Sequence, residues 1–288
     1  MNTTSNNMSF TSIGDCCVDI YPDLQKVFLG GTAFNVAFHA QNAGARASII
    51  SAVGDDLYGH LFFQVAQENN MNTDHLALQE GKTSSVFIPL DAEGKPIFSG
   101  WDLGVLEHFM LTDQHEHFLQ TQDAASIIFL KPLKTLFTSF CQMRLSGTFK
   151  VCDYAGGSEY SEDIDVIQKY VQDLDLILRS VEYDNHEELS FLKHLAQRSN
   201  TLILATLGAH GSILFSKERE YFEPVVKTNV LDTTGAGDAY IATFVVRYLH
   251  ARNIPDAMRE ASKAAAEVIT QFGASSDLSF PGRKDGPH

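Results

Sequence analysis

Four short apolar segments recur between residues 125 and 205 and limit the folds open to this chain. Segments long enough to form a helix separate them, which predicts βαβ units and a parallel sheet buried on both faces. Ligands of such sheets bind at the carboxyl ends of the strands, where Asp153, Arg179 and Thr206 fall. The apolar segments are residues 125–130, 149–153, 174–178 and 201–205.

The composition is that of a globular protein, with 288 residues, 44% of them hydrophobic and 20% charged. A net charge of −15 argues against nucleic acid or an anionic membrane as the main partner. No run approaches the roughly 18 apolar residues of a membrane span, and the polar residues 1–7 lack a signal-peptide pattern. We therefore expect a cytoplasmic protein whose four cysteines are reduced core thiols.

A strand and a glycine pair mark the N-terminal part. Residues 9–20 have a β-like apolar pattern that ends before a proline. Gly30 and Gly31 then precede a helical stretch. Paired glycines before a helix allow a ligand to approach the backbone closely, and Asn35, in the first turn, can offer its amide to hydroxyl groups.

Residues 83–105 interrupt the alternation of strands and helices. Two short strands, at 85–90 and 95–98, are joined by an acidic glycine-containing turn at 91–94, which predicts a hairpin. Its prolines fit edge strands, so we expect a small β lid outside the main sheet. The predicted boundaries are 9–281 for a single domain, about 20–32 and 83–105 for the lid, and 1–8 and 282–288 for flexible termini.

A second glycine-containing segment, DTTGAGD at residues 232–238, leads into an apolar run with helical periodicity. Gly235 to Asp238 are expected to form the first turn, where free N–H groups and the helix dipole create an anion site. A carboxylate at Asp238 suits a base that takes a proton while an anionic group is held beside it. By itself, the segment also fits a simple glycine turn with a first-turn acid favoured by the dipole.

Three other motifs are excluded by their spacing. Gly81 to Thr83 resemble the end of a P-loop, but Leu76 stands where its first glycine is required. A dinucleotide fingerprint beginning at Gly235 has Tyr240 at its third small position. His115 and His117, two residues apart on a helix, do not face one another, so we assign no metal site to them.

Four segments, in this order and spacing, together resemble the PfkB (ribokinase-like) family of sugar kinases. The resemblance covers roughly residues 10–275 and implies a ribokinase-like α/β fold: a central, mostly parallel sheet with helices on both faces and a small β lid. It implies an ATP-dependent kinase that phosphorylates a primary hydroxyl of a sugar. Within the family, residues 13–22 most resemble the fructoselysine 6-kinases, with fructokinases next. The segments are Gly30-Gly31 with Asn35, VGDD at 53–56, TLG at 206–208 and DTTGAGD at 232–238.

The resemblance also implies roles for individual residues and ligands. It implies ATP and Mg²⁺, a monovalent cation such as K⁺, a small sugar substrate, and a homodimer formed through the β lid. The implied catalytic residues are Asp238 as the base, with Gly235, Ala236 and Gly237 as the anion hole. The implied sugar contacts are Asp19, Gly30, Gly31 and Asn35, and the implied nucleotide contacts are Thr206, Gly208, Gly211 and Thr233.

One departure from the family pattern leaves alternatives open. The family commonly has Asn-x-x-Glu at the end of a strand, where this chain has Arg179 and Glu182. An arginine there either clamps a phosphate directly or weakens the usual magnesium arrangement. Two other functions stay open: a nucleoside or ribose kinase, with Trp101 and Phe98 stacking on a base, and a phosphosugar- or nucleotide-binding protein with reduced catalysis.

Overall fold

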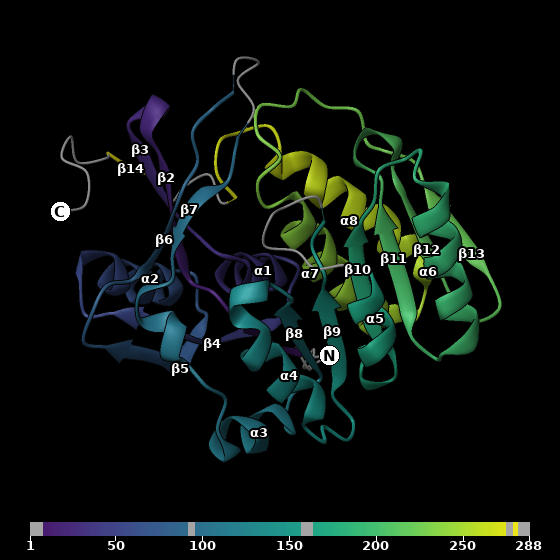
Figure 1. The fold of residues 1–288 in the computed structure, drawn as a ribbon, viewed down its shortest axis with the longest axis horizontal. Helices are drawn as coiled ribbons and strands as arrows, with labels where there is room; N and C mark the ends of the chain where they lie inside the picture. The colour runs from purple at the N-terminus through teal and green to yellow at the C-terminus, as the bar shows by residue number, and fades with distance from the viewer. Residues whose placement is uncertain (1–7, 92–95, 157–163, 275–278, 282–288) are drawn as a thin grey trace, which may run out of the picture.

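A large, mostly parallel sheet runs through the middle of the computed structural model, which describes residues 8–91, 96–156, 164–274 and 279–281 (Figure 1). Neighbouring strands are parallel from β11 to β5, and β12 and β13 run antiparallel at one edge. In spatial order the strands are β13 (Glu220–Glu223), β12 (Ser212–Phe215), β11 (Leu202–Thr206), β10 (Leu176–Ser180), β9 (Phe149–Asp153), β8 (Ala124–Ile128), β1 (Ser9–Ile13), β4 (Arg46–Gly54) and β5 (Asn72–Gln79).

Helices cover both faces of this sheet and bury two separate hydrophobic cores. Successive residues of a strand supply opposite cores, as Ile49 and Ile50 of β4 do. The predicted α/β architecture, with both faces of the sheet covered, is therefore confirmed. One face carries α1 (Thr32–Asn42), α2 (Leu57–Glu68), α7 (Ala236–Ala251) and α8 (Ile254–Val268), and the other carries α3 (Asp113–Leu119), α4 (Lys134–Gln142), α5 (Asp165–Tyr170) and α6 (His186–Arg198).

A second sheet lies beside the first, at the upper left of Figure 1, and corresponds to the predicted lid. It has its own small core, in which Tyr21, Phe28 and Ile88 are buried. The hairpin is present, but its second strand lies at 99–102 instead of 95–98, and most of the turn at 91–94 is outside the described residues. The strands, in order, are β14 (Ser279–Pro281), β3 (Lys26–Gly30), β2 (Cys17–Tyr21), β6 (Ser84–Phe87) and β7 (Ser99–Asp102).

The structure corrects the interpretation of residues 9–20 as one strand. The chain leaves the large sheet after Ile13, at Gly14, whose φ of 137° is in the region that favours glycine. It then re-enters extended structure as β2 in the lid. The two strands have similar apolar patterns because both are buried, so periodicity alone did not separate them. The pairing of β14 with β3 was also not foreseen.

Two expectations from composition can be compared with the described residues. The cysteines at positions 16, 17, 141 and 152 are buried and free of disulfide bonds. Among the helices that the structure describes, none is long and apolar enough to cross a membrane.

Candidate active site

The start of helix α7 has the geometry of an anion site. Gly235 is its N-cap, with a φ of 79°, and a methyl group at this position would overlap Ala274. No side chain caps the helix, and the amides of Gly237 and Asp238 have no hydrogen-bond partner within the described part of the chain. Free first-turn amides together with the helix dipole favour a bound anion.

Asp238 lies next to these amides and is bonded to a residue predicted to contact the sugar. Asn35 Nδ2 donates to Asp238 Oδ2 at 2.8 Å, joining the first turns of α1 and α7. Both side chains are buried, at 3% and 8% exposure for Asn35 and Asp238. Asn35 Oδ1 is also buried and has no partner among the described residues. An unpaired buried acceptor is costly, so it indicates a site for a donor from a ligand or water.

Four buried carboxyl groups come together here, and we call Asp15, Asp19, Asp153 and Asp238 the acidic cluster. Burial raises the pKa of Asp238 to about 8, with further increases from the charges of Asp153 and Asp15. Burial likewise raises the pKa values of Asp15 and Asp153 to about 6. The pKa of Asp19 is raised well above its usual value by burial, then by the charges of Asp15, Asp238 and Asp232. The charges of Asp153 and Asp15 act on Asp238, and those of Asp15 and Asp238 act on Asp19, so the four carboxyl groups lie near enough to interact.

Glycines shape the lid side of the acidic cluster. A methyl group on Gly30 of β3 would overlap the Asp19 carboxylate on the neighbouring strand β2, so only glycine leaves room there. Gly31, with a φ of 84°, lies against the backbone of residues 15–17. Asp15 Oδ1 in turn accepts the backbone N–H of Thr32 at 3.1 Å, at the start of α1. The paired glycines therefore bring β2, β3 and α1 close together.

Asp153 connects the acidic cluster to the strand ends of the large sheet. It is the last residue of β9, and its Oδ1 accepts the N–H of Ala155 at 2.6 Å. A methyl group on Gly237 would lie 3.8 Å from Asp153 Oδ2, so this carboxylate faces the first turn of α7. Asp153 had been placed at a strand end by the sequence, but its proximity to Asp238 had not been predicted.

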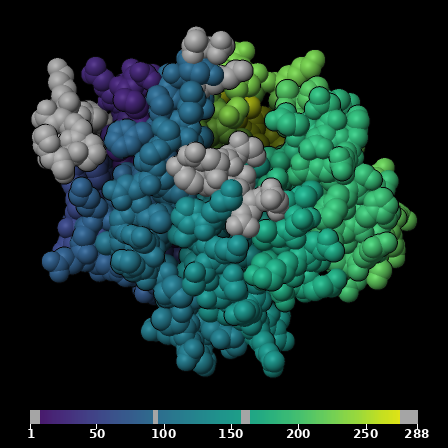
Figure 2. All heavy atoms as spheres, viewed as in Figure 1, coloured from purple at the N-terminus to yellow at the C-terminus, as the bar shows by residue number. Residues whose placement is uncertain are grey.

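A cleft of about 1400 Å³, which we call the strand-end cleft, opens beside the acidic cluster. In Figure 2, yellow atoms of the C-terminal part are recessed between the blue and green parts of the upper edge. Val225, Val226 and Ile269 give the cleft an apolar wall. Of the residues predicted to contact the phosphates or nucleotide, Thr206, Gly208, Gly211, Thr233, Ala236 and Gly237 line this cleft. Ala236 and Gly237 thus separate the cleft from the acidic cluster.

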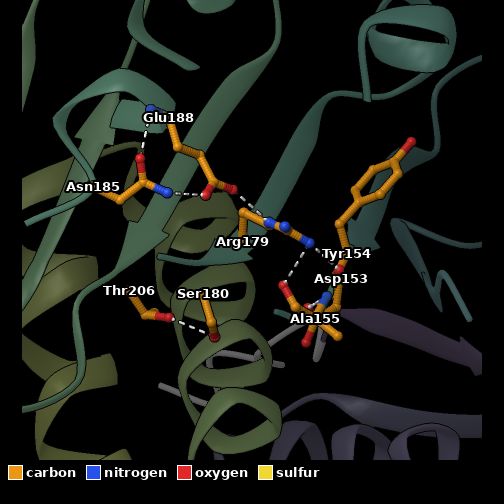
Figure 3. Close-up of polar contacts among 8 residues, drawn as sticks. All are labelled: Asp153, Tyr154, Ala155, Arg179, Ser180, Asn185, Glu188 and Thr206. Carbon is orange, nitrogen blue, oxygen red and sulfur yellow. Dashed lines mark hydrogen bonds and ion pairs between the residues drawn. The ribbon is translucent and has the colours of Figure 1, made fainter. Parts of the chain in front are cut away.

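Arg179 lines the cleft but is held by the protein, as Figure 3 shows. Its Nε donates to Glu188 Oε1 at 2.9 Å, and its Nη1 donates to the carbonyl oxygens of Tyr154 and Ala155 at 3.1 and 3.4 Å. Asn185, the N-cap of α6, fixes Glu188 by donating to its other oxygen at 2.8 Å. Glu188 therefore neutralises Arg179 and joins it to α6, whereas Glu182 lines the cleft separately.

Sequence reasoning missed several residues of this region. Glu188 and Asn185 lie a few residues after Arg179 in the sequence. Because a buried arginine needs an acidic partner, the arginine at position 179 could have prompted a search for a nearby acid and so identified Glu188. At the cleft, the rings of Tyr183 and His210 stack with centroids 4.1 Å apart. Nothing in the sequence brings these two together, because they follow different strands.

A protein-family model described as "pfkB family carbohydrate kinase" matches residues 12–281. Fructoselysine 6-kinase of Shigella flexneri is 28% identical over 266 residues, covering 92% of this chain and 99% of the relative. Fructokinase of Vibrio alginolyticus is 26% identical over 290 residues, covering 92% and 94% of the two chains. These relatives align with almost the whole chain.

Solved structures share the fold. A fructokinase double mutant from Vibrio cholerae O395, bound to fructose, ADP and potassium ion, has a TM-score of 0.78 at 23% identity and covers 95% of this chain and 96% of its own. Arabidopsis thaliana ribokinase, complexed with ribose and ATP, has a TM-score of 0.75 at 16% identity, with 93% and 94% covered. With the family model spanning both glycine-containing motifs and the lid strands β2, β3, β6 and β7, this chain belongs to the pfkB family of carbohydrate kinases, phosphotransferases that act on an alcohol group.

Proposed function

We propose that this sugar kinase transfers the γ-phosphoryl group of ATP to a primary hydroxyl of a ketose or ketosamine, such as fructose or fructoselysine. The observation that carries the proposal is the position of Asp238, a member of the acidic cluster, at the uncapped start of α7, whose residues Ala236 and Gly237 line the strand-end cleft. A base and an anion site in the same helical turn fit a reaction in which a hydroxyl attacks a phosphoryl group.

The proposed mechanism uses the residues of this turn. Asp238 accepts the proton of the sugar hydroxyl, since a pKa raised to about 8 lies close to the pH at which general bases work best. Asn35 orients Asp238 through Nδ2, and its unpaired Oδ1 accepts a second sugar hydroxyl. Asp19 and the glycines at 30 and 31 hold the sugar from the lid side. The amides of Gly237 and Asp238 stabilise the charge that develops on the transferred group.

The nucleotide belongs in the strand-end cleft, whose apolar wall suits a base and whose glycines allow phosphates near the backbone. Mg²⁺ usually binds through one or two carboxylates together with substrate phosphates, and Glu182 and Asp184 line the cleft and can supply them. When bound, Mg²⁺ would neutralise charge on the phosphates. No group of three or more His, Cys, Asp or Glu placed to hold a metal is found among the described residues. A requirement for K⁺ stays a prediction.

The acidic cluster favours a ketosamine over a neutral ketose. Its four carboxyl groups are buried, and Arg179, whose charge lowers the pKa of Asp153, is already paired with Glu188. At neutral pH, Asp15 and Asp153, with pKa values of about 6, are mostly ionised, and a protonated amine on the substrate would offset their negative charge. We therefore expect kcat/KM at neutral pH to be at least about tenfold higher for fructoselysine than for fructose, corresponding to one favourable charge contact.

A nucleoside kinase is the second candidate within the same fold, and the lid aromatic residues give it little support. Trp101 donates its Nε1–H to Ser84 Oγ at 2.9 Å and packs against the lid core. These contacts hold its ring within the lid, which does not favour stacking on a nucleoside base. Phe98 is 45% exposed. A binding protein with reduced catalysis is the third candidate, motivated by Arg179; the hydrogen bond between Asn35 and Asp238 beside the start of α7 supports the kinase instead.

The proposal is tested by measuring ADP release with fructoselysine, fructose, ribose and adenosine at equal concentrations. Turnover with fructoselysine or fructose well above that with ribose and adenosine is the expected result. Preferred turnover of adenosine or ribose would establish the second candidate. Sugar binding detected by calorimetry without ADP release would establish the third.

We also propose that two copies of this chain form a homodimer through the lid sheet. Ile97 and Phe98, next to β7, are large apolar side chains exposed on the lid, which supports a homodimer through this sheet. Sedimentation of wild type and of a variant with both residues changed to Ser would test it, since loss of a dimer only in the variant is expected. Location in the cytoplasm stays a prediction from the sequence.

A further inference from the structure

Tyr21 ends strand β2 of the lid and is completely buried. Its ring packs edge to face with Phe28 of β3, at a centroid distance of 5.3 Å, and with Phe272, at 6.3 Å. Phe272 follows helix α8, so the ring contacts both the lid and the C-terminal part of the large domain. Its hydroxyl group reaches further, to the loop before α7.

That hydroxyl donates to Asp232 Oδ2 at 2.7 Å. Asp232, which is 1% exposed, also accepts the backbone N–H of Gly273 on Oδ2 at 2.9 Å and that of Thr234 on Oδ1 at 2.8 Å. The hydroxyl of Thr234 lies 3.1 Å from that of Tyr21. One buried carboxylate therefore joins the lid, the loop that leads into α7, and the segment that follows α8.

The segment 272–274 is packed tightly between the lid and α7. A methyl group on Gly273 would lie 2.6 Å from the ring of Phe28, too close for any side chain. On the other side, Ala274 occupies the space next to Gly235, the N-cap of α7. A displacement of the lid would therefore be transmitted to the helix start by direct contact as well as by hydrogen bonds.

Strand β2 also carries Asp19, two residues before Tyr21. Side chains two apart on a strand lie on the same face, so Asp19 and Tyr21 project from β2 in the same direction. Asp19 joins the acidic cluster, while Tyr21 bonds to the loop that begins α7. The position of one strand thus sets both the sugar-side carboxylate and the anion site.

We propose that Tyr21 is a positioning residue that, through Asp232, holds the start of α7 in register with Asp19 of the lid. The proposal rests on the proposed function, in which Asp19 holds the sugar and the first turn of α7 holds the phosphoryl group. Correct placement of two reacting groups is worth large rate factors, and an error of about 1 Å can cost roughly 100-fold. Tyr21 touches neither reacting group in this arrangement and acts through the backbone of residues 232–235.

The test is Tyr21→Phe, which removes one hydroxyl and keeps the ring packing. We expect kcat to fall about tenfold while the KM values for sugar and ATP change less than about threefold, because alignment is needed most in the transition state. The matched control is Tyr170→Phe, which also removes the hydroxyl of a largely buried ring, bonded to Thr138 Oγ1 at 3.4 Å on the opposite face of the sheet. The control should retain kcat within about twofold.

Two further measurements separate positioning from general stability. In a background of Asp232→Asn, Tyr21→Phe should lower kcat less than about twofold, because residues that act through one contact are not additive. Amide hydrogen exchange should become faster in peptides spanning 230–238 and 271–274 of Tyr21→Phe, but not of Tyr170→Phe. The exchange experiment needs no substrate.

Each outcome decides a separate point. Unchanged kcat in Tyr21→Phe, or an equal loss of kcat in the Asp232→Asn background, would overturn the positioning role. If wild type releases no ADP with any sugar, the proposed function fails, and hydrogen exchange alone then decides whether Tyr21 couples the lid to α7. Unchanged exchange in both peptides would overturn that coupling.

Discussion

The acidic cluster and the strand-end cleft lie on either side of the same helix start, yet they are built differently. Asp15, Asp19, Asp153 and Asp238 are buried ionisable side chains whose pKa values are raised by burial, and for Asp19 and Asp238 also by neighbouring carboxylates. The cleft is lined by glycines and apolar side chains together with polar and charged ones such as Glu182, Asp184 and Lys227, and its arginine is paired with Glu188. The acidic cluster thus concentrates buried ionisable groups, whereas the strand-end cleft is an open volume of about 1400 Å³.

Under the proposed function, this difference would decide how the two substrates are selected. Buried carboxylates discriminate strongly, because a ligand that leaves them without partners incurs a large desolvation cost. The larger cleft, open beside the α7 amides, leaves more room for ligands that differ in shape but carry phosphates. Substitutions in the acidic cluster should therefore change catalysis and pH dependence, and those in the cleft should act mainly on nucleotide affinity or stability.

The largest effect is expected for Asp238→Asn. It removes the proposed base but keeps a group of the same size next to Asn35, so kcat should fall by about 100-fold or more. Steady-state ADP release measures this, with Asp113→Asn on the exposed start of α3 as the control. Turnover of Asp238→Asn close to that of wild type would remove Asp238 from the mechanism.

Gly235 at the start of α7 and Gly208 in the strand-end cleft both have positive φ, but they should differ in how well they tolerate replacement by alanine. Gly235→Ala combines left-handed strain with overlap of Ala274, so the free energy of unfolding should fall by about 2–4 kcal/mol. Gly208→Ala has the same kind of strain, at a φ of 55°, but meets no atom within 4 Å and should cost only about 1 kcal/mol. Urea unfolding compares them, and equal losses would contradict the crowding assigned to Gly235.

The acidic cluster should make the ligand-free protein less stable as the pH rises. A carboxyl group whose folded pKa is raised contributes stability that is fully present below its unfolded pKa and is lost as the pH rises through the folded pKa. With Asp15 and Asp153 at about 6 and Asp238 at about 8, the window extends from about 4 to about 8. Between about pH 4 and pH 8 the melting temperature of the wild type should fall by several degrees. The fall should be smaller for Asp153→Asn, which has one buried carboxyl group fewer.

The same substitution should alter the pH profile of activity. The charge of Asp153 is one cause of the raised pKa of Asp238, so Asp153→Asn should move the acidic limb of kcat/KM to lower pH. A limb that stays in place, or moves to higher pH, would contradict electrostatic contact between the two carboxyl groups. The Asp113→Asn control should leave the limb unchanged, because this residue lies on α3, outside the cluster.

The smallest effect on catalysis is expected from Arg179→Ala. Because Nε and Nη1 are bonded to Glu188 and to backbone carbonyls, the KM for ATP should change less than about threefold. The free energy of unfolding should nevertheless fall by about 1–3 kcal/mol, since Glu188 loses its partner. A rise in the KM for ATP of more than about tenfold would instead assign Arg179 a direct phosphate contact.

Much of the fold followed from local patterns. The sequence placed the strands β8 to β11 and the start of helix α7 to within a few residues, because buried strands and helices leave characteristic apolar patterns. It failed where two buried strands follow one another, at β1 and β2, and where β14 joins the lid from the far end of the chain. Strand partners are set by contacts that periodicity does not encode.

The sequence by itself determined the α/β class, the two glycine-containing motifs and the acid at the start of α7, since these depend on residues that are neighbours along the chain. Only the tertiary structure decided that Asn35 bonds to Asp238, 203 residues away, and that Tyr21 bonds to Asp232, 211 residues away. It also decided that Glu188 pairs with Arg179 and that the Asp153 carboxylate faces the first turn of α7. Burial and charge repulsion depend on distances through space, and folding sets those distances by packing distant segments against one core.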